Sequence, residues 1–327
     1  MSGSSSTMST RGDDAVSMRS ARQPGIPPVY GPRLRAASPF DAPAPFSVQC
    51  RALRRPGRPM LAVDYHLHST HSKDGRSTVA EMCEAALASG LREICFTEHI
   101  DFDRQDPDYG FLDWPAYAAS VAEARSRFAG RLVIRLGLEF DFRRQYGGEP
   151  GEVLARMPCD FLIGSVHSAA GCHIYRLHGR EGPLDVRALQ AEYLAEVEAL
   201  VASGWAAAVG HFDYLYKQLP ALVAPYRDGW YWPRAEQILA RCVAAGVALE
   251  VNTHHVLDRG LALAADAEIL RRYRALGGRR VTVGSDAHRA GQVAEGFQAA
   301  EQAVRDAGFP AVTGYEQGRP YDIPLAT

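Results

Sequence analysis

From residue 60 onward, short apolar runs alternate with longer segments in which apolar residues recur every three to four positions. The short runs have the length of strands, and the longer segments have the period of amphipathic helices. The predicted strands are Met60–His68, Glu93–His99, Leu132–Phe142, Asp160–His167, Ala206–Tyr214, Ala248–His254 and Val281–His288. This alternation predicts a largely parallel sheet whose strands are joined by helices.

Each predicted helix ends just before a glycine, the residue that most easily adopts the left-handed conformation closing a helix. The helices are Thr78–Ser89, Trp114–Phe128, Val186–Ser203, Pro233–Ala245, Ala264–Leu276 and Gln292–Ala307. The helical pattern is weak only between the third and fourth predicted strands, where Glu152–Met157 would make one or two turns at most. The α/β pattern therefore predicts a parallel (β/α) barrel or a doubly wound sheet.

Residues 1–59 have a different character. They contain nine of the 20 prolines, nine serines, and nine arginines against three aspartates, which gives a local net charge of +6. Because the segment shows no apolar periodicity, it cannot bury enough surface to offset the entropy of ordering it. We expect a disordered Ser/Pro/Arg-rich tail at 1–59 and one large domain at 60–327.

The overall composition, 46% hydrophobic and 23% charged, is that of a globular protein and excludes a collagen-like or fully disordered chain. A net charge of −2 offers no positive field for nucleic acid, so we expect no nucleic-acid partner. We also expect no membrane span, because no apolar stretch reaches 18 residues, and no signal peptide, because the apolar run Met60–Val63 is too short for one. The six cysteines contain no CxxC pair, which favours reduced thiols in the cytoplasm.

Histidines gather where the predicted strands end. Six of the 11 lie at or near these ends, namely His66, His68, His99, His167, His211 and His288. Three acids, Asp74, Glu139 and Asp286, lie at the same positions relative to the strands. In parallel α/β folds the carboxyl ends of all strands meet at one rim, and functional sites are built there.

Each of these motifs alone has an ordinary structural explanation, such as a hydrogen-bonded core histidine or a polar rim residue. His66 and His68 are two apart on a strand, which points both rings to one face. Taken together, the nine residues predict a metal cluster, because nine imidazole and carboxylate ligands exceed what one ion takes. Their number suggests three divalent transition-metal ions, and the ligand types suit Zn, Fe or Mn.

The chain resembles the polymerase and histidinol phosphatase (PHP) superfamily, and within it the monofunctional histidinol-phosphatases. Seven motifs carry the resemblance in the order of the family: His66-Leu-His68, Glu98-His99, Leu138-Glu139, Ser165-Val-His167, Gly210-His211-Phe-Asp213, Glu250-Val-Asn252 and Ser285-Asp286-Ala-His288. The resemblance implies a distorted seven-stranded (β/α) barrel with a trinuclear metal centre. It also implies three ligand groups: His66, His68, Glu139 and Asp286; Glu139, His167 and His211; Asp74, His99 and His288.

The reaction implied is in-line attack of a hydroxide on the phosphorus of L-histidinol phosphate. Glu98 and His254 are candidates for protonating the leaving oxygen, and either could instead orient metal ligands. Candidates for binding the substrate are Arg176, Arg180 and Arg289, whose alternative role is a solvated surface charge. The loop from Gly171 to Gly182 departs from what the resemblance implies and leaves the substrate open, so an alternative is a phosphoesterase for a nucleotide or another small phosphate ester. An alternative of another class is a polymerase-associated metal-binding module.

Overall fold

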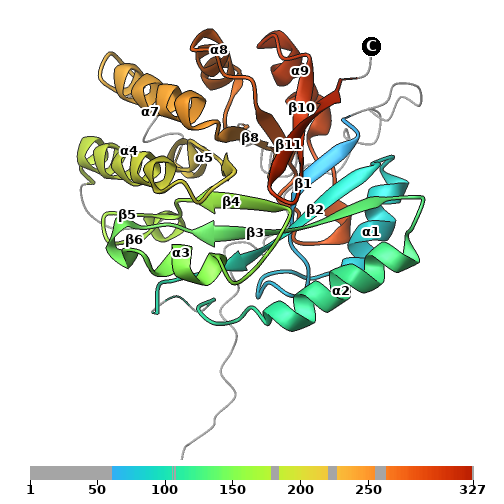
Figure 1. Cartoon of the computed structure of the whole chain (residues 1–327). Helices are drawn as coiled ribbons and strands as arrows, with labels where there is room; N and C mark the ends of the chain where they lie inside the picture. Colours follow the sequence, from blue (N-terminus) through green and yellow to red (C-terminus); the bar gives the residue numbers. More distant parts are fainter. Residues whose placement is uncertain are drawn as a thin grey trace, which may run out of the picture. The chain divides into compact units, whose positions relative to one another are not determined.

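The computed structural model describes residues 61–104, 106, 108–177, 184–219, 227–254 and 263–325. The predicted tail, residues 1–59, lies outside this part, so its disorder stays a prediction. Seven parallel strands form the central sheet in the order β1-β2-β3-β4-β7-β8-β9. They are β1 (Val63–Leu67), β2 (Glu93–Ile100), β3 (Val133–Asp141), β4 (Phe161–Ser165), β7 (Ala208–Val209), β8 (Ala248–Asn252) and β9 (Val281–Gly284). Figure 1 labels β1, β2, β3, β4 and β8.

The two edge strands of this sheet come together and nearly close it into a barrel. Beyond the end of β9, the backbone N–H of Asp286 donates to the carbonyl of His66 at 2.8 Å. The N–H of His68 donates to the carbonyl of Ala287 at 2.9 Å, and a parallel bridge joins Leu67 to Ala287. The prediction of a seven-stranded (β/α) barrel is therefore confirmed over the doubly wound alternative.

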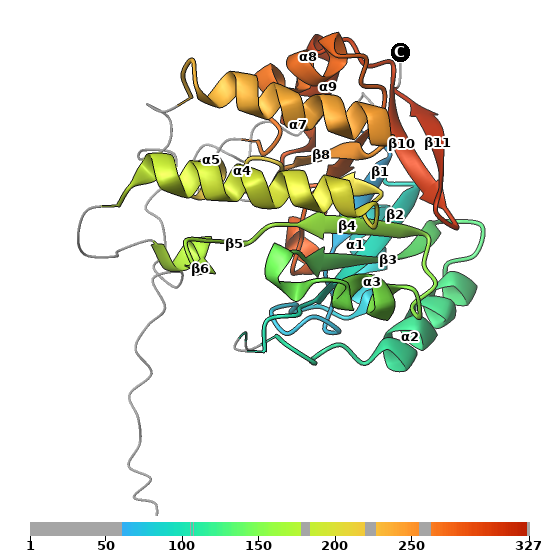
Figure 2. The same cartoon turned by 60° about the vertical axis from the view of Figure 1, so that its left-hand side comes forward.

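Helices cover the outside of the barrel, as the prediction required. They are α1 (Val79–Ala88), α2 (Trp114–Arg127), α3 (Glu149–Leu154), α4 (Val186–Ser203), α5 (Tyr214–Gln218), α7 (Tyr231–Ala245), α8 (Ala267–Ala275) and α9 (Phe297–Asp306). Figure 2 shows α4 and α7 side by side on one flank. The glycines after the six predicted helices all have positive φ, which confirms how these helices end.

Two helices begin later than predicted, for local reasons. Helix α8 starts at Ala267 because the Asp266 side chain accepts hydrogen bonds from the N–H groups of Glu268 and Ile269 and caps it. Helix α9 starts at Phe297 because Ala294 and Gly296 adopt positive φ. Strand β7 is also much shorter than predicted, since the backbone turns at Gly210 and His211.

Two antiparallel hairpins were not predicted. One is β5 (Ser168–Ala169) with β6 (Cys172–His173), and the other is β10 (Ala311–Glu316) with β11 (Arg319–Pro324). The second lies at the amino-terminal end of the barrel strands. There the N–H of Tyr315 donates to the Tyr65 hydroxyl at 2.8 Å, and that hydroxyl donates to Glu93 at 2.5 Å. This hairpin therefore fastens the end of the chain to its first two strands.

Within the described part of the chain, no helix combines the length and apolar character needed to cross a bilayer. The hydrophobic core consists of fully buried apolar side chains on the barrel strands and on the helices that cover them. Examples are Leu67 and Phe96 on the strands and Met82 on α1. The expectation of no membrane span agrees with this finding.

Asp64 stabilises the closure of the barrel. Its side chain is fully buried, and its two oxygens accept hydrogen bonds from the Ser285 N–H at 2.9 Å and the Ser285 hydroxyl at 2.5 Å. They also accept from the N–H groups of His66 and Ala294, both at 3.3 Å. One carboxylate thus ties β1 to the segment that follows β9.

We expect Asp64→Asn to lower the free energy of unfolding by about 2–4 kcal/mol, because an amide nitrogen would face donors that now face an oxygen. For a domain of this size, that corresponds to a melting temperature lower by roughly 5–10 °C. Thermal unfolding followed by circular dichroism would measure it, with the exposed Asp306→Asn as the matched control. Equal melting temperatures for the two variants would contradict the role given to Asp64.

Candidate metal centre

The nine residues singled out by their positions in the sequence converge at the carboxyl end of the barrel. His66, His99 and Glu139 lie on β1, β2 and β3. The others lie on the loops that follow the strands, namely His68 and Asp74 after β1, His167 after β4, His211 after β7, and Asp286 and His288 after β9. The rim is thus built by six of the seven barrel strands.

Glu139 occupies the middle of this cluster and is only 1% exposed. Its two oxygens face five imidazoles. The distances from Oε2 are 3.1 Å to His66 Nε2, 3.5 Å to His68 Nε2 and 3.0 Å to His99 Nδ1, and those from Oε1 are 3.1 Å to His211 Nε2 and 3.5 Å to His167 Nε2. A single carboxylate therefore borders two separate histidine groups.

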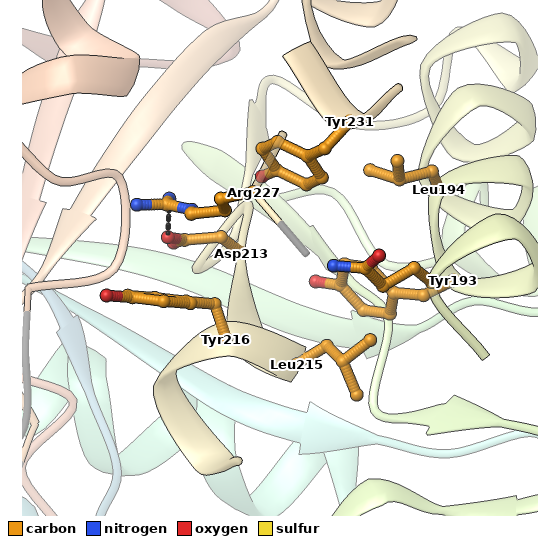
Figure 3. Close-up of a pocket in the computed structure, with 8 residues that line it drawn as sticks. Tyr193, Leu194, Asp213, Leu215, Tyr216, Arg227 and Tyr231 are labelled. Carbon is orange, nitrogen blue, oxygen red and sulfur yellow. Dashed lines mark hydrogen bonds and ion pairs between the residues drawn. The ribbon is translucent and has the colours of Figure 1, made fainter. Parts of the chain in front are cut away.

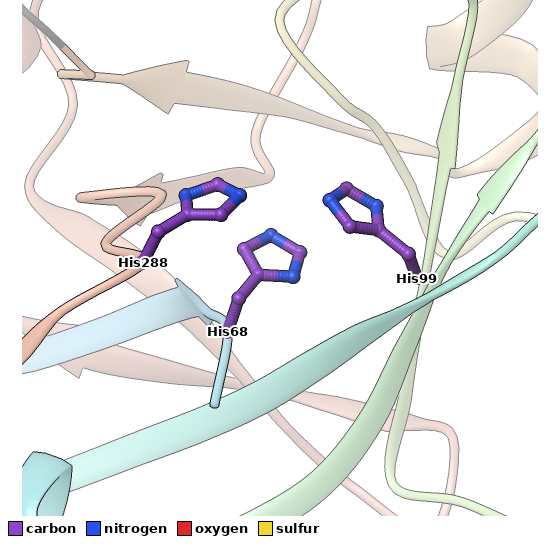
Figure 4. A group of neighbouring side chains, drawn as sticks. All are labelled: His68, His99 and His288. Atoms are coloured by element: carbon purple, nitrogen blue, oxygen red, sulfur yellow. The ribbon is translucent and has the colours of Figure 1, made fainter. Parts of the chain in front are cut away.

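A third group of side chains, His99, His288 and Asp74, lies around His68. The His68 ring stacks between those of His99 and His288, with centroids 4.1 and 4.4 Å away (Figure 4). Asp74 completes this group, since its Oδ2 lies 3.0 Å from His288 Nε2 and 3.7 Å from His99 Nε2. Asp74 is the most exposed of the nine, so this group forms the open side of the cluster.

Asp286 connects the first and third groups. Its Oδ1 lies 3.7 Å from His66 Nε2, 3.4 Å from His68 Nε2 and 3.6 Å from His288 Nδ1. Both Asp286 and His211 have positive φ, 52° and 27°, which non-glycine residues rarely adopt. Such strained conformations persist where the surroundings enforce them, as at functional sites.

Two buried carboxylates that sequence reasoning did not select orient the histidines. His66 Nδ1 makes a short hydrogen bond to Glu250 Oε1, and His167 Nδ1 lies 3.3 Å from Asp141 Oδ1. Each contact turns the opposite nitrogen, Nε2, toward Glu139, as is usual for histidine ligands of metals. Asp141 is two residues after Glu139 on β3, a same-face spacing that could have identified it.

The residues around Glu139 fit a cation. Nε2 of His66 and of His68 are buried and have no hydrogen-bond partner. Burial and the neighbouring imidazoles lower the pKa of His68 to about 3, so its ring is neutral, as a ligand must be. Burial raises the pKa of Glu139, but the surrounding imidazoles outweigh it and hold that pKa well below its usual value. One neutral nitrogen donor, His68 Nε2, and one charged oxygen donor, Glu139 Oε2, thus lie 3.5 Å apart.

Two residues after His211, the buried Asp213 forms an ion pair with Arg227 (Figure 3). The Arg227 guanidinium lies 2.7 Å from Asp213 and 2.6 Å from Asp266, and it stacks over the Tyr216 ring at 4.0 Å. On the other side, the Tyr193 hydroxyl donates to the Phe212 carbonyl at 3.1 Å. These contacts fix the turn that directs His211 toward Glu139.

The remaining predicted residues have varied surroundings. Glu98 is buried and accepts hydrogen bonds from the hydroxyls of Ser69 and Ser72, both at 2.6 Å. His254 lies beside the third group, with its ring 5.4 Å from that of His288. Arg289 is exposed next to that group, Arg176 is exposed and bonds to the Tyr175 hydroxyl, and Arg180 lies outside the described residues.

A model of the PHP domain matches residues 64–254, more than half of the chain. The chain belongs to the PHP domain family. A histidinol-phosphatase of Lactococcus lactis is 29% identical over 76% of this chain and 93% of its own length. A probable histidinol-phosphatase of Deinococcus radiodurans is 34% identical over 76% of this chain and 95% of its own length.

A solved structure of this PHP family is also similar over most of the barrel. The crystal structure of the Lactococcus lactis histidinol phosphate phosphatase, complexed with zinc, L-histidinol and phosphate, has a TM-score of 0.68 and 26% identity. It covers 80% of this chain and 98% of that one. With its clusters of histidine and glutamate, the chain is a metal-dependent phosphoesterase of the PHP family, similar to histidinol-phosphatases.

We expect Glu139→Gln to be the most damaging single carboxylate change. It keeps the size of the side chain but removes the charge that faces two histidine groups, and uncompensated repulsion between cations there is worth several kcal/mol. It should lower kcat by on the order of a hundredfold or more and reduce the amount of bound metal. Asp74→Asn should weaken metal binding only at the third group, which contains Asp74, His99 and His288. Metal analysis, circular dichroism and kcat would test both variants. Normal metal content and rate in folded Glu139→Gln would refute its central role.

Proposed function

We propose that the nine rim residues hold three divalent transition-metal ions, of Zn, Fe or Mn type. The observation that carries this proposal is the position of Glu139 between two histidine groups, with the buried, unpartnered Nε2 atoms of His66 and His68 directed at its Oε2. His66, His68, Glu139 and Asp286 would form one site. Glu139, His167 and His211 would form the second, and Asp74, His99 and His288 the third.

The substrate that we propose is L-histidinol phosphate, cleaved to L-histidinol and phosphate. Bound divalent ions lower the pKa of water and neutralise charge on phosphoryl oxygens, which is the chemistry that a phosphomonoesterase requires. Support comes from the relatives named histidinol-phosphatase and from the Lactococcus lactis complex with L-histidinol and phosphate. Relatives named as phosphatases also favour an enzyme over a polymerase-associated module.

We assign the other predicted residues as follows. Glu98 orients the loop after β1, because the Ser72 hydroxyl that donates to it also accepts from the His99 N–H at 3.0 Å and lies 3.3 Å from His68 Nδ1. For His254, the proposed role is to pass a proton to the leaving oxygen, which its position beside His288 supports. Arg289 and Arg176 are the described candidates for binding the substrate, and Arg289 is the one adjacent to a proposed ligand.

Purified protein should carry close to three transition-metal ions per chain, and a chelator should abolish its phosphatase activity. Elemental analysis of the fully active protein, together with titration of chelator-treated protein with Zn, Fe and Mn, would measure this. One equivalent or fewer in fully active protein would rule out the three-ion assignment.

The substrate assignment requires a separate measurement. Phosphate release by metal-replete protein should be fastest with histidinol phosphate in a panel that includes nucleoside monophosphates and sugar phosphates. A preference measured as kcat/KM would support the proposal. Faster turnover of a nucleotide or sugar phosphate would replace histidinol phosphate and leave the metal chemistry intact.

A further inference from the structure

Lys217 is a buried cation that the proposed reaction does not use. It lies on α5, which follows the turn of His211 to Asp213, and is only 2% exposed. Its Nζ donates a hydrogen bond to Asn252 Oδ1 at 2.6 Å. The chain contains only two lysines, against 34 arginines. An ammonium group is a compact donor on a flexible stem, and the planar guanidinium of arginine does not replace it in a confined space.

Asn252 links this lysine to the metal centre. It ends strand β8 and is fully buried. Its Nδ2 donates to Asp286 Oδ2 at 3.1 Å and lies 3.4 Å from each oxygen of Glu250. Glu250 in turn bonds to His66 Nδ1 and accepts from the His211 N–H at 2.8 Å. The amide of Asn252 therefore faces two carboxylates. Asp286 is itself a proposed metal ligand, and Glu250 contacts two others, His66 and His211.

The two ends of an asparagine amide have opposite hydrogen-bonding roles, so its orientation decides whether these contacts are favourable. An ammonium group can only donate, and Oδ1 also accepts from the His254 N–H at 3.0 Å. Two donors therefore hold the oxygen on one side of Asn252. The NH₂ group must then face Asp286 and Glu250, which can only accept when ionised.

We propose that Lys217 is a positioning residue of the metal centre: it fixes the amide of Asn252 so that this amide holds the carboxylate of Asp286 ready for metal binding. The inference rests on the proposed metal sites and is independent of which phosphate ester is the substrate. Without the ammonium group, the His254 N–H alone would hold the amide oxygen, and the amide would be oriented less firmly toward Asp286. Outer hydrogen bonds of this kind contribute about 10–100-fold to metal affinity in known metalloproteins.

The test compares Lys217→Met, Asn252→Ala and the double variant with the wild-type full-length protein. Zinc affinity is measured by competition with a chromophoric chelator, and turnover is measured with p-nitrophenyl phosphate. Lys217→Met should weaken zinc binding by about 10-fold or more, and the double variant should be no weaker than Asn252→Ala alone, because the lysine acts through the amide. Saturating zinc should restore kcat in Lys217→Met, with KM unchanged.

Two comparisons separate this role from others. Arg127→Met removes a cation from the surface of α2 and should keep wild-type zinc affinity. Asn252→Asp retains a partner for Lys217 but turns the donor facing Asp286 into an acceptor, so zinc affinity should fall in protein that circular dichroism shows to be folded, even if Lys217→Met fails to fold. The proposal would be overturned by wild-type zinc affinity in folded Lys217→Met or in Asn252→Asp. It would also be overturned by additive effects in the double variant, or by a raised KM that saturating zinc does not correct. If wild-type protein retained no zinc, the proposed metal sites themselves would fail instead.

Discussion

The buried carboxylate of Glu139 is the constraint on which this structure depends. An ionised carboxylate removed from water is strongly destabilising unless opposite charge or hydrogen-bond donors surround it. Here the surrounding groups are imidazoles from β1 and β2 and from the loops after β1, β4 and β7, segments separated by up to 145 positions in the sequence. They reach Glu139 only when the barrel closes. Completing the fold and assembling the cluster are therefore one event.

A second layer of buried acids supports the first. Asp64, Glu98, Asp141 and Glu250 do not face the middle of the cluster, yet each binds backbone N–H groups or the rear nitrogen of a histidine. A carboxylate accepts several hydrogen bonds at once, so it can hold a loop and a ring together. The barrel thus uses acidic side chains both as proposed ligands and as supports for the loops that carry them.

The sequence predicted the barrel well where signals are local. Glycines end helices, and apolar runs of strand length mark the parallel strands, so α4 was predicted with its observed bounds. The two-residue strands of the β5–β6 hairpin have no periodicity to detect, and β7 is short because the backbone turns at His211. The gathering of nine polar residues at the rim followed from the rule that parallel strands end at one face. Lys217 was not selected, and Glu250 was named only within a family motif and without this role, because their contacts, to Asn252 and His66, depend on packing between distant segments.

The hairpin β10–β11, at the amino-terminal end of the barrel strands, affects the order in which the protein can fold during its synthesis. Tyr65 in the first strand finds the backbone N–H of Tyr315 as its partner, a residue synthesised 250 positions later. Contacts of such sequence separation form slowly, because a long loop must close before they stabilise anything. The first strand is thus synthesised well before its partners in the hairpin, and the barrel can complete neither its β1–β9 closure nor its amino-terminal end until residues 281–324 have been added.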